Sequence, residues 1–264
     1  MDFKARRIVL PTPGPDQVEI RREIVYKSAG ALTLKLDLYR PTAPGPHPAV
    51  IFVHGDAPGP VLADAKDWGQ YRSWGELTAA SGLAAVTFTH RSTERLTRAE
   101  EALSDVTDLL AYVRQHAGEL GIDPERLGLW VCSAGGPVGL TPVLTGAAGP
   151  IRCAAALYPL LEIGPDRVPP GLTLEELRPL SPLSALERAE APVPPLLLVR
   201  AGQDHPNFTQ SAERFAAAAL ARNLELELIN YATGHHGFDL VNDEERSRQI
   251  IRRVVDFFRE RLGA

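Results

Sequence analysis

Ser133 is the residue whose neighbours point most directly to chemistry. It follows the apolar run Leu127–Val131 and precedes the small residues Ala134, Gly135 and Gly136. A strand that passes through a serine into a helix has the sequence form of a nucleophile elbow. Small neighbours are needed because the serine adopts a strained backbone conformation that raises its hydroxyl above the sheet. The segment therefore predicts a nucleophile, although a serine in this place can also be a simple helix cap.

Two features of this segment depart from the usual pattern. Val131 stands where the G-x-S-x-G form has its first glycine, so the match is not strict. Cys132 offers a second nucleophilic side chain, but it lies on the strand side of the turn. We therefore expect Ser133, and not Cys132, to react.

A serine nucleophile requires a base within hydrogen-bond reach and an acid that orients the base. In a strand–serine–helix architecture the acid comes next in the sequence and the histidine last. Asp204 follows an apolar strand-like run, and His235 and His236 lie in a glycine-bounded loop after the next such run. We favour His236 as the base because a small and an aromatic residue follow it. The order predicts a triad of Ser133, Asp204 and His236, although each residue alone has an ordinary structural explanation.

Acyl transfer at such a serine also requires N–H donors for the oxyanion. One commonly follows the nucleophile, and another comes from the loop after an earlier central strand. Ala134 would supply the first donor, and Asp56, with Ala57 as a further candidate, would supply the second. We expect the preceding His54 to be a structural loop residue.

An aromatic loop and a proline-rich segment are the candidates for the walls of the substrate pocket. The long loop after the oxyanion strand carries Trp68 and Tyr71, and its aromatic surface together with Ala57 and His235 could wall the pocket. Residues 160–194, which contain seven prolines, could form the opposite wall as a small lid, or a surface helix packed on the body.

Strands and helices alternate along the chain in a way that could position these residues. Two alternating stretches come first and predict an antiparallel pair, after which short apolar runs and helical stretches follow one another. Helices between successive strands require parallel neighbours. The expected strands are Gln17–Lys27, Ala31–Arg40, Ala49–Val53, Leu83–Phe88, Leu127–Val131, Ala154–Tyr158, Pro195–Val199 and Leu224–Ile229, and the expected helices are Tyr71–Ser81, Arg98–Leu120, Gly135–Leu144, Thr209–Arg222 and Asp243–Leu262.

Length and composition describe one soluble α/β domain over residues 1–264. The chain has 264 residues with 44% hydrophobic and 23% charged residues, which is typical of a globular protein. A net charge of -5 gives no general electrostatic reason to bind nucleic acid or an anionic membrane. We expect a small-molecule substrate, and whether the chain forms a homodimer is left open.

Cofactor, metal and targeting motifs do not emerge from the sequence. Residues 1–10 lack an apolar signal segment and no run is long enough to span a bilayer, so we expect a cytoplasmic protein. The two cysteines lack the spacing of a disulfide framework or a metal site. Nucleotide-binding and HExxH motifs are missing as well, so we expect neither cofactor nor metal.

Five short segments together resemble the α/β-hydrolase superfamily, and more narrowly its dienelactone-hydrolase and carboxylesterase-like branch. They are His54–Gly55, Ile122–Arg126, Cys132–Gly136, Gly202–Asp204 and His236–Phe238. The resemblance implies an α/β-hydrolase fold, with a mostly parallel eight-stranded sheet, helices on both faces, a small cap-like excursion and the site at the C-terminal edge of the strands.

The resemblance also implies an activity. Dienelactone hydrolases usually have a cysteine nucleophile, so Ser133 favours ordinary ester hydrolysis through an acyl-enzyme, with short to medium acyl chains. Two alternatives stay open: a peptidase of the prolyl-oligopeptidase-like type, and a ligand-binding protein that keeps the fold without turnover.

Overall fold

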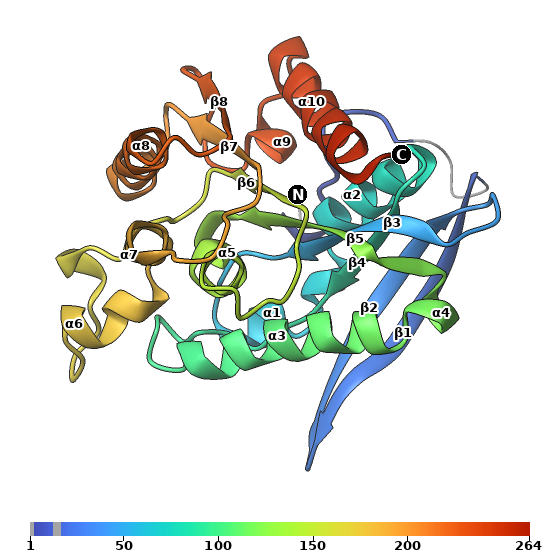
Figure 1. Ribbon diagram of the computed structural model, residues 1–264, viewed down its shortest axis with the longest axis horizontal. Helices are drawn as coiled ribbons and strands as arrows, with labels where there is room; N and C mark the ends of the chain where they lie inside the picture. Colours follow the sequence, from blue (N-terminus) through green and yellow to red (C-terminus); the bar gives the residue numbers. More distant parts are fainter. Residues whose placement is uncertain (1–2, 13–16) are drawn as a thin grey trace.

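The computed structural model describes residues 3–12 and 17–264, so Met1–Asp2, the start of the segment inspected for a signal peptide, lies outside it. Eight strands form one sheet in the order β1-β2-β4-β3-β5-β6-β7-β8 (Figure 1). The β1–β2 and β2–β4 pairs are antiparallel and all others are parallel. The strands are β1 Val18–Ala29, β2 Leu32–Pro41, β3 His47–Val53, β4 Ala84–Phe88, β5 Ile122–Cys132, β6 Cys153–Leu157, β7 Leu196–Ala201 and β8 Leu226–Tyr231. The predicted mostly parallel eight-stranded sheet is confirmed.

Helices cover both faces of this sheet (Figure 1). Helices α3, α5, α7 and α8 contribute to the core on one face, and α2 and α10 to the core on the other. The α-helices are α1 Gly59–Leu62, α2 Gly69–Ala80, α3 Ala99–Gln115, α4 Ala117–Leu120, α5 Gly136–Leu144, α6 Leu174–Leu177, α7 Pro182–Arg188, α8 Pro206–Ala221, α9 Phe238–Val241 and α10 Glu245–Leu262. Short 3₁₀ helices are η1 Phe3–Ala5, η3 Ala65–Asp67, η4 Ser133–Gly135, η5 Pro165–Arg167 and η6 Arg178–Leu180.

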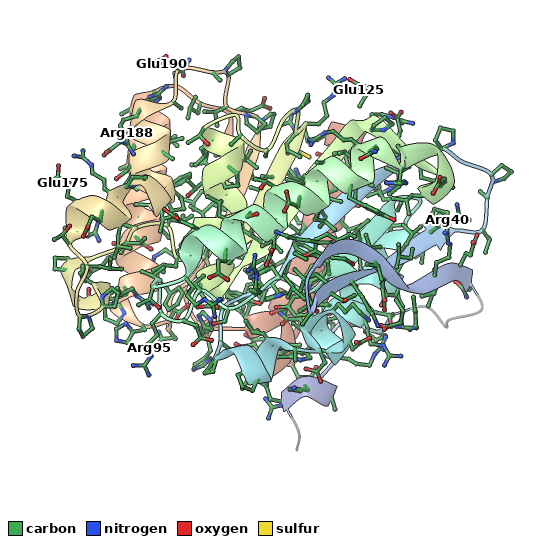
Figure 2. The ribbon with its side chains drawn as sticks, turned by 90° about the horizontal axis from the view of Figure 1, so that it is seen from below. Arg40, Arg95, Glu125, Glu175, Arg188 and Glu190 are labelled. Carbon is green, nitrogen blue, oxygen red and sulfur yellow. The ribbon has the colours of Figure 1, made fainter. Side chains whose placement is uncertain are left out.

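The central strand β3 is a continuous apolar run because both of its faces are buried. Successive side chains point to opposite faces of a sheet. Ile51 and Val53 enter the core under α3 and α5, whereas Val50 and Phe52 enter the core under α2 and α10. Each face is covered, so both sets must be apolar. Charged side chains such as Arg40, Glu125 and Glu190 lie instead at the periphery of the molecule, as Figure 2 shows.

The helices differ from the sequence expectation in two respects. The helix expected over Arg98–Leu120 is broken at His116, which ends α3 and caps the separate turn α4. The single-turn helices α1 and α9 and the two-turn helix α7 were not anticipated, because such short elements carry too few residues to display a helical period.

No helix within residues 3–12 and 17–264 has both the length and the apolar character that crossing a membrane requires.

Residues 160–194 form η5, α6, η6 and α7 at one side of the sheet (Figure 1). Thr173 caps α6 reciprocally with Glu176, which explains why this short helix begins there. Leu183 and Leu186 of α7 are buried in the same core as α5 and α8. Thus α7 is part of the body, and a mobile lid stays a prediction for the rest of the segment.

Val131, the departure from the elbow pattern, is accommodated by a glycine on the following helix. A Cβ added to Gly139 of α5 would lie 2.7 Å from Cγ1 of Val131 and 3.1 Å from Cγ1 of Val53. Real side chains essentially never approach so closely. The space that a glycine usually leaves on the strand is therefore left by Gly139 on the helix.

We expect Gly139→Ala to destabilise the protein by about 1–3 kcal/mol, because the new methyl group overpacks the strand–helix contact. Adding Val131→Ala should recover part of this loss, since it removes the side chain that collides. Chemical denaturation of the single and double variants measures both effects. Gly118→Ala in α4 is the control, because its added Cβ meets nothing within 4 Å. Strictly additive losses would contradict this account.

Candidate active site

The carboxyl ends of β5, β7 and β8 bring Ser133, Asp204 and His236 together at one edge of the sheet. Ser133 Oγ lies 2.8 Å from Nε2 of His236, and Nδ1 of His236 lies 2.6 Å from Oδ2 of Asp204. The Asp204 side chain is only 3% exposed, while that of His236 is 39% exposed. This geometry suits a hydroxyl that donates to Nε2 while Nδ1–H donates to the buried carboxylate.

The backbone at Ser133 is held in the conformation that an elbow requires. Its φ is 53°, in the left-handed region that non-glycine residues rarely adopt. A Cβ on Gly135 would lie 2.4 Å from the carbonyl oxygen of His54, and one on Gly136 would lie 2.1 Å from that of Leu160. Larger residues would push these neighbouring chains away. The small residues after the serine are thus needed for close backbone contacts.

Backbone hydrogen bonds tie the loop of Asp204 to the loop of His236. Gly202 N–H donates to the carbonyl of Tyr231 at 2.8 Å, and Gln203 N–H donates to that of Gly234 at 2.8 Å. The two loops follow adjacent parallel strands, β7 and β8. The separation between carboxylate and imidazole is therefore set by main-chain contacts.

The imidazole of His236 is packed between two aromatic rings. Its centroid lies 4.9 Å from that of Tyr158 and 4.6 Å from that of Phe208. His235 instead contacts Asn242, whose Oδ1 accepts the His235 N–H at 3.0 Å and whose Nδ2 lies 3.3 Å from Nδ1 of His235. Of the two candidate histidines, His236 makes the contact with Ser133.

A cavity of about 690 Å³ opens beside this arrangement. It is lined by Asp56, Ala57 and Ala134, and therefore by both residues expected to stabilise an oxyanion. Gly55 approaches the serine closely, since a Cβ added to it would lie 3.2 Å from Cβ of Ser133. The loop after β3 and the turn after β5 thus face the same space.

The carboxylate of Asp56 is engaged by the loop after β4. It accepts hydrogen bonds from Thr93 N–H at 3.0 Å and from Ser92 Oγ at 3.3 Å, and a further short one from Thr93 Oγ1. These bonds fix the oxyanion loop to a second loop that also lines the cavity. Sequence reasoning used only the N–H of Asp56 and missed this structural use of its side chain.

Three residues expected in the pocket wall do not border this cavity. Trp68 and Tyr71 are 8% and 3% exposed and belong to the core against α2, and neither they nor His235 line the cavity. The reason is that their polar atoms have internal partners. Tyr71 OH accepts from Gly55 N–H at 3.3 Å, and Trp68 Nε1 donates to Asp64 at 3.0 Å. Only Ala57 of the expected wall residues borders the cavity.

The walls of this cavity come largely from two other loops. One contains Glu94, Arg95 and Leu96, and the other is 166–170 within the proline-rich segment. The first three have φ values of 45°, 56° and 75°, a left-handed turn without a glycine. No residue type in the sequence signals such a turn, which is why the wall was not anticipated.

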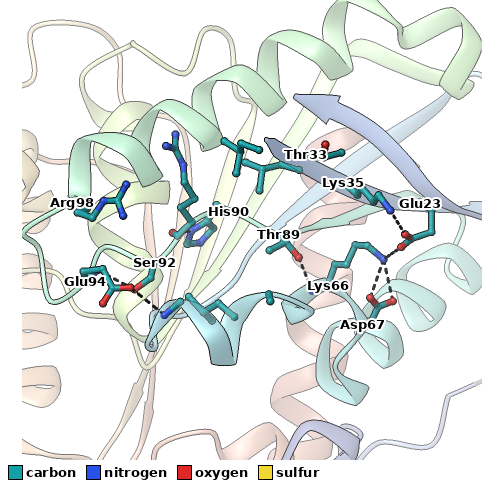
Figure 3. Close-up of a pocket in the computed structure, with 16 residues that line it drawn as sticks. Glu23, Thr33, Lys35, Lys66, Asp67, Thr89, His90, Ser92, Glu94 and Arg98 are labelled. Carbon is teal, nitrogen blue, oxygen red and sulfur yellow. Dashed lines mark hydrogen bonds and ion pairs between the residues drawn. The ribbon is translucent and has the colours of Figure 1, made fainter. Parts of the chain in front are cut away.

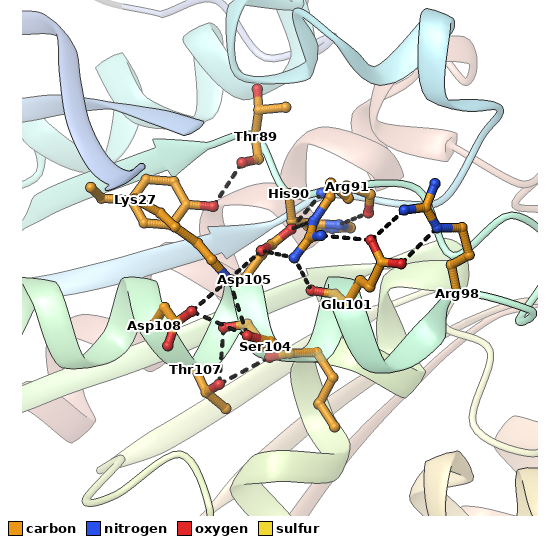
Figure 4. A network of polar contacts seen from close by, with 12 residues as sticks. Lys27, Thr89, His90, Arg91, Arg98, Glu101, Ser104, Asp105, Thr107 and Asp108 are labelled. Atoms are coloured by element: carbon orange, nitrogen blue, oxygen red, sulfur yellow. Dashed lines mark hydrogen bonds and ion pairs between the residues drawn. The ribbon is translucent and has the colours of Figure 1, made fainter. Parts of the chain in front are cut away.

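A buried charge network anchors the loop after β4 (Figure 4). Asp105 of α3 is fully buried and accepts from Arg91 Nε at 2.8 Å and from Lys27 Nζ at 2.6 Å. Burial opposes ionisation, but the hydrogen bonds from the two cations prevail and lower the pKa of Asp105. The chain just before the cavity wall is therefore attached to both α3 and β1.

A second cavity of about 450 Å³ lies on the other side of this loop (Figure 3). At its edge Glu23, Asp37 and Asp67 form the one cluster of metal-binding geometry found among the described residues. The ammonium of Lys66 occupies the centre of that cluster, paired with Glu23 and lying 3.0 Å from both Asp37 and Asp67. Hydrogen bonds from lysines lower the pKa of Glu23 to about 2. These charges neutralise one another without an ion.

The remaining candidate groups are neutral and buried. Burial raises the pKa of the Cys132 thiol to about 12, so it is a poor source of thiolate at neutral pH. His54 is 1% exposed and its ring stacks on His90 with centroids 3.6 Å apart. Burial lowers the pKa of His54 well below its usual range, so it stays uncharged inside the fold.

Comparison with known proteins agrees with this fold. The family model BD-FAE, which describes α/β-hydrolase-type esterases, matches residues 36–149. No curated protein sequence matches the chain significantly.

Solved structures resemble the chain over nearly its whole length. The apo form of Thermogutta terrifontis esterase 2 shares 23% identity at a TM-score of 0.73, covering 95% of this chain and 97% of the esterase. A bacterial heroin esterase shares 20% identity at a TM-score of 0.73, covering 94% and 85%. The dienelactone-hydrolase and carboxylesterase-like branch stays a prediction. By its sheet order, its elbow and these likenesses, the chain has the α/β-hydrolase fold.

Proposed function

We propose that the protein is a serine hydrolase that cleaves carboxylic esters of small molecules through an acyl-enzyme intermediate. The observation that carries this proposal is the unbroken contact from Ser133 Oγ through His236 to Asp204, with separations of 2.8 and 2.6 Å. It starts from a serine whose φ of 53° is otherwise unfavourable. Strain of this kind is typical of residues held for chemistry.

The reaction follows from the positions of these atoms. Ser133 Oγ attacks the ester carbonyl while Nε2 of His236 accepts its proton, and Asp204 stabilises the imidazolium that forms. The tetrahedral oxyanion would be bound by the N–H groups of Ala134 and Asp56, which border the cavity. Protonated His236 then gives its proton to the departing alcohol, and water activated by the same imidazole releases the acid.

The similar solved structures support ester hydrolysis by a serine nucleophile. Thermogutta terrifontis esterase 2 has been solved phosphorylated by paraoxon, and a second similar structure is a heroin esterase. At 22% and 20% identity these likenesses concern the fold, so the activity of this chain is a proposal that rests on its own triad geometry. No observation in the described residues favours peptide substrates over esters.

Replacing Ser133 by alanine should remove turnover of p-nitrophenyl acetate and butyrate, with a loss in kcat of about 10⁴-fold or more, because the nucleophile is gone. Circular dichroism and the melting temperature should show an intact fold. Cys132→Ala is the matched control at the adjacent position, and it should retain most of the activity. Turnover that survives in Ser133→Ala but disappears in Cys132→Ala would overturn the proposal.

Acyl length provides a separate test of the cavity. Four charged residues of the two wall loops, Glu94, Arg95, Asp166 and Arg167, are among those that line it. A long alkyl chain would lie against these groups and would not gain the roughly 0.8 kcal/mol per methylene that burial in an apolar tunnel provides. We therefore expect kcat/KM for p-nitrophenyl esters to stop rising beyond butyrate. A continuous rise through octanoate and laurate would contradict this specificity.

A further inference from the structure

A second buried carboxylate lies close to the proposed triad but takes no part in it. Asp239, in the short helix α9 just after His236, is fully buried. Its Oδ2 accepts hydrogen bonds from Gln70 Nε2 and Trp74 Nε1, each at 2.9 Å. Its Oδ1 accepts one from Tyr158 OH at 2.7 Å. Both oxygens are thus occupied by donors from distant parts of the chain.

All of these donors are neutral, which makes the arrangement costly. None of the ion pairs formed within residues 3–12 and 17–264 involves Asp239, and burial raises its pKa while the hydrogen bonds from Trp74, Gln70 and Tyr158 act against that rise. Asp105, by contrast, is paired with Arg91 and Lys27. A buried carboxylate without a cation adds little stability compared with apolar packing. Its presence therefore calls for another role.

Tyr158, one of the three residues that donate to Asp239, also packs against the imidazole of His236. Tyr158 follows β6, has a φ of 39°, and packs its ring 4.9 Å from that of His236. Its hydroxyl donates to Asp239 and accepts from Gln70 Nε2 at 2.8 Å. The strained backbone and the fully bonded hydroxyl leave this ring one position.

His236 needs such support because its side chain is 39% exposed. Its Nδ1 contacts Asp204 and its Nε2 contacts Ser133, but hydrogen bonds at the two ring nitrogens do not prevent the ring from tilting about the line that joins them. Tyr158 on one side, and Phe208 at 4.6 Å, limit the tilt. Water around the exposed part of the His236 ring does not restrain its tilt in this way.

We propose that Asp239 is a positioning residue for the reaction. By holding Tyr158 and the α9 turn, it keeps Nε2 of His236 aimed at Ser133 Oγ. This inference rests on the proposed function, because it assigns a task within the same site. It concerns orientation, so its effect belongs to the chemical step and not to substrate binding.

Two substitutions separate this role from general stability. In Asp239→Asn, the amide nitrogen must face one of the donors that now reach both oxygens, so at least one contact is lost whichever way the amide turns. Tyr158→Phe keeps the ring but removes the hydroxyl that fixes it. Since both changes break the same link, the double variant should lose no more activity than the more affected single variant.

The experiment measures kcat per functional active site. Paraoxon titration counts the sites that are correctly folded and reactive, and hydrolysis of p-nitrophenyl butyrate is then divided by that count. Each single variant should lose about 10-fold in kcat with KM changed less than about 2-fold. Asp243→Asn is the matched control, because it removes an exposed carboxylate from the same segment and should leave kcat unchanged.

The possible results are distinct. A purely structural role would lower the number of titrated sites while kcat per site stayed within about 2-fold of the unmodified protein, and this result would overturn the inference. Fully multiplicative losses of kcat in the double variant would overturn it as well. If Asp239→Asn does not fold, Tyr158→Phe decides the question alone. If the unmodified protein neither reacts with paraoxon nor hydrolyses the ester, the proposed function itself fails.

Discussion

The close approach of three chain segments around Ser133 is the constraint on which the rest of the site depends. The serine can remain at a φ of 53° only because the carbonyls of His54 and Leu160 press against Gly135 and Gly136. These contacts join the loop after β3, the turn after β5 and the chain after β6. A left-handed non-glycine residue costs on the order of 1–3 kcal/mol, so the surrounding packing must hold it in place. Ala134 and Leu160 of these segments line the cavity.

Sheet topology explains why the sequence predicts the central residues well. Loops that follow parallel strands emerge at one edge, so the order of Ser133, Asp204 and His236 along the chain is enough to predict that they meet. The strands themselves are recognisable because burial on both faces demands continuous apolar runs, as in Leu127–Val131. Even the valine at the elbow follows this rule, since Gly139 provides its space.

The cavity walls follow no comparable rule. Trp68 and Tyr71 were expected there, but an aromatic residue in a loop fits a wall and a core equally well, and internal hydrogen bonds favour the core. The wall at Glu94–Leu96 follows Ser92 and Thr93, which donate hydrogen bonds to Asp56, a residue far away in the sequence. Local pattern carries no information about such partners. Specificity is therefore harder to predict from sequence than chemistry is.

Asp105 and Asp239 illustrate how the fold assigns different buried carboxylates to specificity and to chemistry. Asp105 is held by cations and attaches the loop that forms the cavity wall, so its charge is compensated. Asp239 is held by neutral donors, and one of them, Tyr158, packs its ring against the imidazole of His236. Neutral donors fix the carboxylate without adding positive charge near the imidazole. Asp105 therefore joins elements of the fold through charge, whereas Asp239 fixes the hydroxyl of an aromatic ring through neutral hydrogen bonds.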